Sequence, residues 1–253
     1  TTTIRVGSLV FANDYRHPAV LARDAATVDR LSGGRLEFGI GAGWKTTDYE
    51  AAQIPLDRPS VRIARLEEAV QVVKGLWADG PFSFDGEHYR IRALDGAPKP
   101  AQRPGPPVVI GGGGRKVLEV AGRHADVVHL NPSLPAGVID ARAGATATAA
   151  ATEQKIAWVR AAAGDRFDDL TFAVRVHLVV VTDDRDGTID LLADGFGLTH
   201  DEAAATPHAL CGTVGQICDD LVERRERFGI SDIGISASSM DDLAPVIARL
   251  AGT

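Results

Sequence analysis

The strongest constraint on the fold is a repeated alternation of short apolar runs with longer segments of helical periodicity. The apolar runs have the length of buried strands and lie at 4–11, 35–41, 108–110, 126–130, 172–181 and 233–235. Segments with helical spacing of apolar residues separate several of these runs. Strands that alternate with helices favour a parallel sheet with right-handed helical crossovers. The sequence therefore predicts an α/β fold with six parallel strands.

Local signals place the ends of several helices. Pro18 suits the first position of a helix, and Gly33 suits the left-handed residue that ends one, so a helix is expected between them. The residues expected on its buried face are Val20, Leu21, Ala25, Val28 and Leu31. Thr213-x-x-Gln216 has the form of a capping box before a helix that ends near Phe228.

The connecting segments suggest one domain. An antiparallel hairpin is expected at 82–91, as an insertion at about 80–95, because Asp-Gly between β-prone flanks favours a tight turn. The proline-rich stretch 98–107 is interpreted as a loop within the domain. The alanine-rich stretch 138–163 is interpreted as a scaffold helix. Residues 1–253 are therefore expected to form a single domain.

Composition and charge exclude several classes of function. The 253 residues carry a formal net charge of −7 without a long basic run, which argues against nucleic acid as a partner. No apolar stretch approaches the roughly 18 residues of a membrane span. Cys211 and Cys218 form no disulfide framework, and Cys211 is interpreted as an ordinary buried cysteine. Because the histidines also lack metal-ligand spacing, we expect a cytoplasmic protein without a metal or a membrane.

Four consecutive glycines at 111–114 follow one apolar run and precede a helix. Main-chain N–H groups at a helix N-terminus bind anions, and glycine lets a phosphate approach the backbone. The run is no P-loop, because Val117 follows Lys116, and no dinucleotide fingerprint, which needs glycine in place of Lys116. A phosphate site is therefore predicted here, with a tight turn that binds nothing as the alternative.

Two further features have two interpretations each. Gly39, Gly41 and Gly43 either let a strand and a helix pack closely or form a floor under a flat ring, with Trp44 at its edge. His17 follows the first strand, where parallel barrels place their functional residues. It either contacts an anion of a substrate or cofactor, or has a structural role as the cap of the helix that follows or as a hydrogen-bonded, half-buried histidine.

Several of these motifs, in this order, resemble the bacterial luciferase-like monooxygenase superfamily. The matching segments are Arg16-His17-Pro18-Ala19-Val20, Leu31-Ser32-Gly33-Gly34-Arg35-Leu36, Gly39-Ile40-Gly41-Ala42-Gly43-Trp44, Arg65-Leu66-Glu67-Glu68-Ala69 and Val109-Ile110-Gly111-Gly112-Gly113. Order and spacing agree over nearly the whole chain. Within the superfamily, the sequence looks most like the members that use coenzyme F420 rather than FMN.

The resemblance implies a luciferase-like (β/α)8 TIM barrel, with a redox cofactor at its mouth and a homodimeric assembly. Matched by position, one group of residues would lie beneath or beside the cofactor ring: Ser8, Leu9, Val10, Gly41, Ala42, Gly43 and Trp44. The peptide bond between Leu9 and Val10 would be cis. The phosphate would be held by Gly111, Gly112, Gly113 and Gly114.

The resemblance also implies that the first two strand–helix units precede Thr1. The second strand of such a barrel usually ends with a catalytic or cofactor-contacting His or Asp, so the main catalytic candidate is expected before Thr1. His17 and Trp44 are the lesser candidates within the chain. The predicted function is an oxidoreductase or monooxygenase that transfers hydride or oxygen between reduced F420, or FMN, and a small organic substrate. The alternative is a catalytically inert flavin-binding or assembly protein on a truncated barrel.

Overall fold

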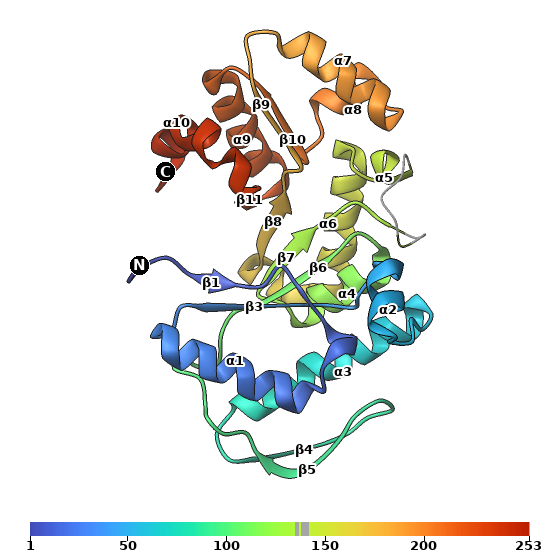
Figure 1. The fold of residues 1–253 in the computed structure, drawn as a ribbon, viewed down its shortest axis with the longest axis vertical. Helices are drawn as coiled ribbons and strands as arrows, with labels where there is room; N and C mark the ends of the chain where they lie inside the picture. The colour runs from blue at the N-terminus through green and yellow to red at the C-terminus, as the bar shows by residue number, and fades with distance from the viewer. Residues whose placement is uncertain (135–136, 138–141, 253) are drawn as a thin grey trace.

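A computed structural model describes residues 1–134, 137 and 142–252 of the chain. Its centre is a curled sheet of seven strands in the order β1-β3-β6-β7-β8-β11, with β2 also beside β3 (Figure 1). Every neighbouring pair in this sheet is parallel. The strands are β1 (Val6–Gly7), β2 (Phe11–Ala12), β3 (Leu36–Gly41), β6 (Val108–Gly112), β7 (Val127–Leu130), β8 (Thr171–Arg175) and β11 (Ile230–Gly234). The predicted parallel α/β fold is confirmed, and within the described residues the sheet forms a half-barrel.

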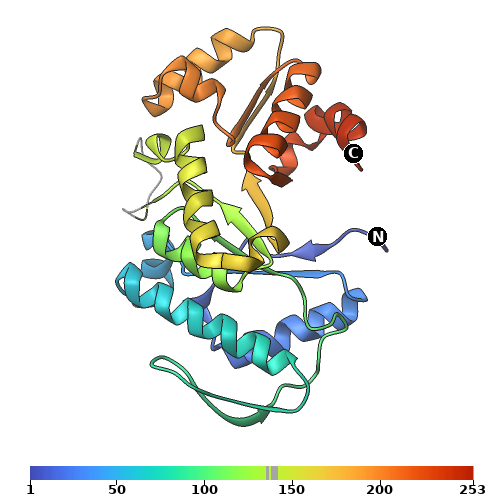
Figure 2. The ribbon, with the colours of Figure 1, turned by 180° about the vertical axis from the view of Figure 1, so that it is seen from behind.

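Helices cover one face of this sheet, and the core lies between them. Figure 2 shows α3, α4 and α6 side by side over that face. In β3, Leu36, Phe38 and Ile40 belong to the core, so Gly39 and Gly41 lie on the opposite face. The covering helices are α1 (Pro18–Ser32), α3 (Pro59–Trp77), α4 (Arg115–His124) and α6 (Ala149–Ala163).

The remaining described elements surround the half-barrel. After β3 comes α2 (Thr46–Ala52), and the predicted hairpin is confirmed as β4 (Pro81–Asp85) paired with β5 (Arg90–Asp95). The alanine-rich stretch contains α5 (Arg142–Ala145) before α6, and its first residues, 138–141, lie outside the described residues. Short 3-10 helices are η1 (Asn13–Tyr15), η2 (Gly164–Asp169) and η3 (Ala237–Ser239). No helix in the described part of the chain is long and apolar enough to cross a membrane.

The predicted long strand at 172–181 is wrong as a single element. It divides into β8 in the large sheet and β9 (Leu178–Val181), which pairs in parallel with β10 (Ala209–Gly212) in a second sheet. Both halves are apolar because each packs in a core of its own, so composition alone shows no division. Helices not expected from the sequence, α7 (Arg185–Phe196) and α8 (His200–Ala204), precede β10. The last helices are α9 (Val214–Phe228) and α10 (Met240–Leu250).

The predicted strand at 4–11 also differs in the structure. Residues 4–11 were expected to be a buried strand, but β1 and β2 are two short pieces along the same edge of β3. Val6 and Phe11 are exposed, because β1 is an end strand of the sheet within the described residues. The Leu9–Val10 peptide bond between the two pieces is cis, as the resemblance implied.

Most of the predicted helix ends are confirmed, but one predicted helix face is right only in part. Gly33 ends α1 in the left-handed conformation, and Thr213 and Gln216 form a full capping box on α9. Leu21 and Ala25 are buried as expected, but Val20, Val28 and Leu31 are exposed, and Ala22 and Ala26 lie on the buried face in their place. Small side chains let α1 lie close to α3, so the largest apolar residues did not mark the whole buried face.

Candidate functional site

The structure brings the predicted cofactor-binding segments 8–10, 41–44 and 111–114 to one edge of the half-barrel. In a parallel sheet the carboxyl ends of all strands meet at the same edge. Ile40 of β3 pairs with Ile110 of β6, and Gly111 pairs with His129 of β7. Segments 41–44 and 111–114 therefore lie at the carboxyl ends of neighbouring strands, and 8–10 lies against β3 between β1 and β2.

Ser8, Leu9 and Val10 lie directly on the glycines of β3. The Ser8 hydroxyl donates a hydrogen bond to the Gly39 carbonyl at 2.8 Å. A Cβ atom on Gly39 would overlap the Ser8 carbonyl oxygen, and one on Gly41 would lie 2.7 Å from a methyl of Val10. The glycines thus let the segment 8–10 pack directly against β3, so the close packing expected from the sequence is present, but with this segment and not with a helix. The floor under a flat ring stays a prediction.

The glycine run joins β6 to α4 and has one open position. A Cβ atom on Gly113 would lie 2.5 Å from the Asn131 carbonyl oxygen, so Gly113 packs against the residues after β7. Gly114 is the N-cap of α4, has no side chain to satisfy the first N–H groups, and faces open space. Unpaired N–H groups at a helix start suit an anion. The predicted phosphate site is thus geometrically consistent, and Gly114 is the position a ligand would meet.

The turn after β3 is held in place by Arg62 of α3, which the sequence analysis missed. The buried Arg62 guanidinium donates to the Ala42 carbonyl at 3.0 Å, to the Asp57 carbonyl at 2.9 Å, and to the Gly43 carbonyl. Gly43 has φ +73° and lies against the Tyr49 ring, so a side chain there would clash. Trp44 follows on the surface with 42% of its area exposed, consistent with a position at the rim.

His17 is a helix cap in this structure. Its Nδ1 accepts a hydrogen bond from the Ala19 N–H at 3.2 Å, and its ring lies edge-on to Tyr89 with centroids 5.3 Å apart. The capping interpretation of His17 is confirmed. Nothing in these contacts gives His17 a catalytic role.

A polar group on the same edge was missed by the sequence analysis. His129 of β7 is 4% exposed, and neither of its ring nitrogens has a partner within the described residues. Burial lowers the pKa of His129 to about 4, so its imidazole is neutral at pH 7. Alternation along 126–130 could have placed it opposite the core-facing Val128 and Leu130.

This polar group is extended by Arg175, the last residue of β8, and by His177, between β8 and β9. Arg175 pairs with Gly234 of β11 in the sheet, and its guanidinium donates to the Ser236 hydroxyl at 3.2 Å. Within the described residues, Arg175 makes no ion pair with a carboxylate. His177 is exposed, and its N–H donates to the His208 carbonyl at 2.8 Å. This edge therefore presents a cation and imidazoles beside the predicted cofactor segments.

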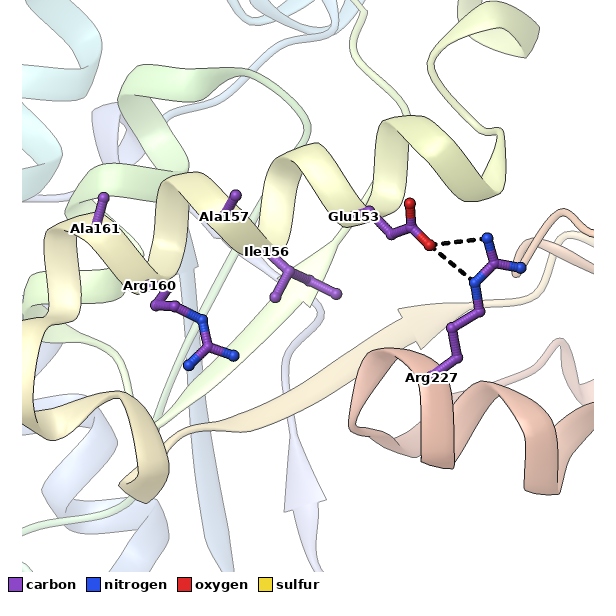
Figure 3. A pocket seen from close by; sticks show the side chains of 6 residues that line it. All are labelled: Glu153, Ile156, Ala157, Arg160, Ala161 and Arg227. Atoms are coloured by element: carbon purple, nitrogen blue, oxygen red, sulfur yellow. Dashed lines mark hydrogen bonds and ion pairs between the residues drawn. The ribbon is translucent and has the colours of Figure 1, made fainter.

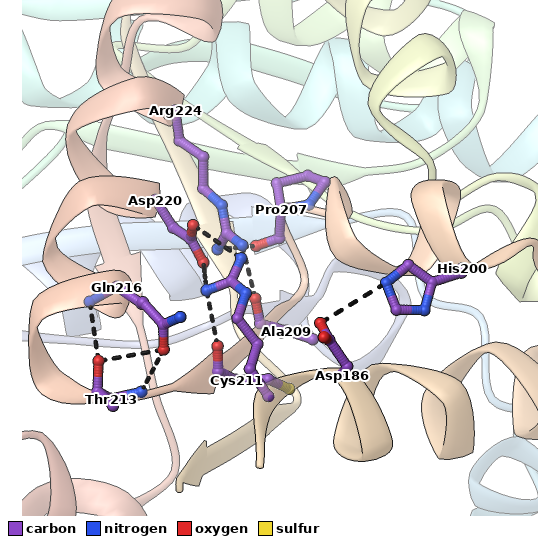
Figure 4. Close-up of polar contacts among 10 residues, drawn as sticks. Asp186, His200, Pro207, Ala209, Cys211, Thr213, Gln216, Asp220 and Arg224 are labelled. Carbon is purple, nitrogen blue, oxygen red and sulfur yellow. Dashed lines mark hydrogen bonds and ion pairs between the residues drawn. The ribbon is translucent and has the colours of Figure 1, made fainter. Parts of the chain in front are cut away.

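The second sheet is fixed by a charged network that is distinct from this edge (Figure 4). Arg185 forms a two-point ion pair with Asp220 at 3.0 Å and donates to the Cys211 carbonyl at 2.9 Å. The buried Arg224 donates to the Ala209 carbonyl at 2.7 Å. Burial raises the pKa of the Cys211 thiol. These contacts agree with the interpretation of Cys211 as an ordinary buried cysteine.

A cavity of about 380 Å³ lies on the outside of the fold, between α6 and α9 (Figure 3). Two of the residues that line it, Glu153 and Arg227, form an ion pair at 2.8 Å. None of the residues predicted for the cofactor lines it. Among the described residues, no three His, Cys, Asp or Glu side chains are grouped so that they could hold a metal ion.

Comparison with known proteins identifies the family. Residues 1–208 match the model of the luciferase-like monooxygenases. The chain is 30% identical over 222 residues to the FMNH2-dependent dimethylsulfone monooxygenase of Pseudomonas putida, covering 86% of this chain and 59% of that protein. It is 33% identical over 127 residues to the F420-dependent glucose-6-phosphate dehydrogenase of Kineococcus radiotolerans, covering 50% of this chain and 37% of that protein.

A solved structure shows the same fold. The coenzyme F420-dependent tetrahydromethanopterin reductase of Methanopyrus kandleri aligns with a TM-score of 0.74 at 17% identity, covering 97% of this chain and 82% of that chain. The chain spans less than two thirds of the length of either curated relative. With a family model that matches most of its length and a half-barrel of the corresponding type, the chain belongs to the luciferase-like monooxygenase family.

Proposed function

We propose that the protein is an oxidoreductase that binds a flavin-type cofactor at the carboxyl edge of the half-barrel and acts on a small organic molecule. The observation that carries this proposal is the convergence of segments 8–10, 41–44 and 111–114 on that edge. The two curated relatives are named for reduced FMN and for F420, which share a flat tricyclic ring and a phosphate.

The residues present fit such a cofactor. The segment 8–10 lies flat on the glycines of β3 and would support the ring, while Trp44 would border it. Gly114 and the first N–H groups of α4 would hold the phosphate. When bound, the reduced cofactor supplies the electrons of the reaction. The chain binds and orients that cofactor, with Arg62 fixing the turn at its rim.

The substrate is assigned to the side of the edge formed by β7, β8 and β11. Arg175 is the cation there, and it could bind an oxygen acceptor of the substrate together with the Ser236 hydroxyl. His177 is the exposed imidazole that could hold or move a proton at a ring nitrogen. Trp44 has no acidic proton and is assigned to the cofactor rim only.

We further propose reduced FMN as the cofactor, although the sequence motifs look most like those of F420 users. The match to the FMNH2-dependent relative covers 86% of the chain, against 50% for the F420-dependent relative. We expect micromolar or tighter binding of reduced FMN, and binding of F420 at least about tenfold weaker. Anaerobic titration followed by fluorescence tests this. Tighter binding of F420 would overturn the cofactor assignment, and micromolar binding of neither would overturn the site.

Two substitutions of Gly114 test the phosphate site. Gly114→Asp and Gly114→Asn both supply a good N-cap for α4 in open space, so both should fold with stability within about 1 kcal/mol of the unmodified protein. Only the carboxylate repels a phosphate. We expect the Kd for FMN to be about tenfold higher or more in the Asp variant than in the Asn variant, with equal Kd values for riboflavin. Equal affinities of the two variants for FMN would contradict the assignment of the phosphate to this site.

A further inference from the structure

Lys155 in the middle of α6 is buried without a carboxylate partner. The residue is 2% exposed. Its ammonium group donates hydrogen bonds to the carbonyl oxygens of Asn131, at 2.7 Å, and Thr146, at 2.6 Å. Within the described residues it forms no ion pair. Burial lowers the pKa of Lys155 to about 8. An ammonium group in such surroundings is costly, whereas a methionine of similar length would fill the same space.

The carbonyl held by Lys155 belongs to the segment that supports the glycine run. The Asn131 N–H donates to the Gly112 carbonyl at 2.9 Å. Gly113 lies so close to Asn131 and Pro132 that a Cβ atom there would clash with both carbonyl oxygens. Lys155 is therefore one peptide group away from the loop assigned to the phosphate.

The second contact of Lys155 strengthens the same support. Lys155 donates to the carbonyl of Thr146. The hydroxyl of the same residue accepts a hydrogen bond from the Ser133 N–H at 2.8 Å. Lys155 thus contacts both ends of the segment 131–133, which we call the frame. It contacts Asn131 directly and Ser133 through Thr146. Residues 131 and 132 of this frame pack against Gly113, whereas Gly114 faces open space.

We propose that Lys155 is a positioning residue for the cofactor phosphate. It fixes 131–133 against Gly113 so that the glycine run keeps the shape that a phosphate requires, and it places a positive charge behind that run. This inference rests on the proposed function, because it assumes that the phosphate binds at 111–114. Lys155 itself lies behind the backbone and does not touch the cofactor.

The test compares a flavin with and without its phosphate. In the full-length protein we expect Lys155→Met to raise the Kd for FMN about tenfold or more, and to change the Kd for riboflavin by less than about twofold. If the Met variant does not fold, Lys155→Gln, which keeps a donor but no charge, is measured instead with the same expectation. Equal losses for both ligands, or no loss for either, would overturn the role.

Lys74 provides a matched control. It is also a lysine whose ammonium donates to a main-chain carbonyl, that of His124 at 2.7 Å, but it lies at the opposite end of α4. Lys74→Met should leave the ratio of the FMN and riboflavin Kd values unchanged. If the unmodified protein shows no preference for FMN over riboflavin, the phosphate site itself fails, which is distinguishable from failure of the Lys155 role alone.

Discussion

Gly39→Ala is expected to lower the free energy of unfolding by about 3 kcal/mol or more, the upper range for overpacking a core position. A methyl group on Gly39 would overlap the Ser8 carbonyl oxygen. The backbone fixes the positions of both atoms, so no rotamer change can separate them. The chain on either side of Ser8 is paired to β3, at Gly7 and at Phe11, so the segment 8–10 has little room to shift. Urea denaturation followed by circular dichroism measures the loss.

Gly195→Ala is the matched control for this substitution. Gly195 lies within α7, and a Cβ atom there meets nothing within 4 Å. Alanine favours a helix over glycine by up to about 1 kcal/mol, so this variant should be as stable as the unmodified protein or slightly more stable. A Gly39→Ala variant of unchanged stability and unchanged FMN affinity would show that the segment 8–10 does not need close contact with β3.

The second large effect is a loss of stability in acid. Burial lowers the pKa of His208 to about 3 and that of His129 to about 4, from an ordinary value of 6.5. Below pH 6.5 the unfolded chain takes up protons at these residues while the folded chain does not, so the folded state loses stability as the pH falls. At pH 4.5 each histidine should cost about 2 to 3 kcal/mol relative to pH 7.5.

His208→Gln separates this effect from the titration of carboxylates. The His208 ring makes a hydrogen bond at 3.0 Å between its Nδ1 and the Arg175 carbonyl, a contact that a glutamine amide can also make. The midpoint of urea denaturation is measured at pH 7.5 and 4.5 for both proteins. The variant should lose about 2 to 3 kcal/mol less than the unmodified chain between these two pH values. Identical losses would show that His208 is protonated as readily in the folded as in the unfolded state.

The sequence predicts the half-barrel well because its signals are local. Apolar runs, Pro18, Gly33 and the Thr213 capping box each act within a few residues, and the structure confirms the elements they indicate. The long strand at 172–181 is different, because its division depends on which sheet each half joins. Which strand a segment pairs with depends on residues far away in the sequence. A continuous apolar run therefore does not indicate where one strand ends and the next begins.

The site was predictable where backbone shape is encoded by glycine. Gly41, Gly43 and the run 111–114 indicate close backbone approach, and the structure places them on one edge. Arg62 and Lys155 were missed because their partners are main-chain carbonyl groups, 5 to 24 residues away, which have no side-chain signature. His129 was missed for a different reason: its inward position follows from alternation with Val128 and Leu130, but a single histidine in a strand has no motif.

The division of 172–181 also determines how the two sheets can open. The N–H of Val176 donates to Gly234 in the large sheet, and the N–H of the next residue, His177, donates to His208 beside the second sheet, both at 2.8 Å. Because these two adjacent amides donate to different parts of the fold, we expect them to exchange independently of each other. In native-state hydrogen exchange, Val176 reports on opening of the half-barrel and His177 on release of the β9–β10 pair. The exchange rates of these two neighbouring amides thus allow the local stability of the half-barrel and of the β9–β10 sheet to be compared.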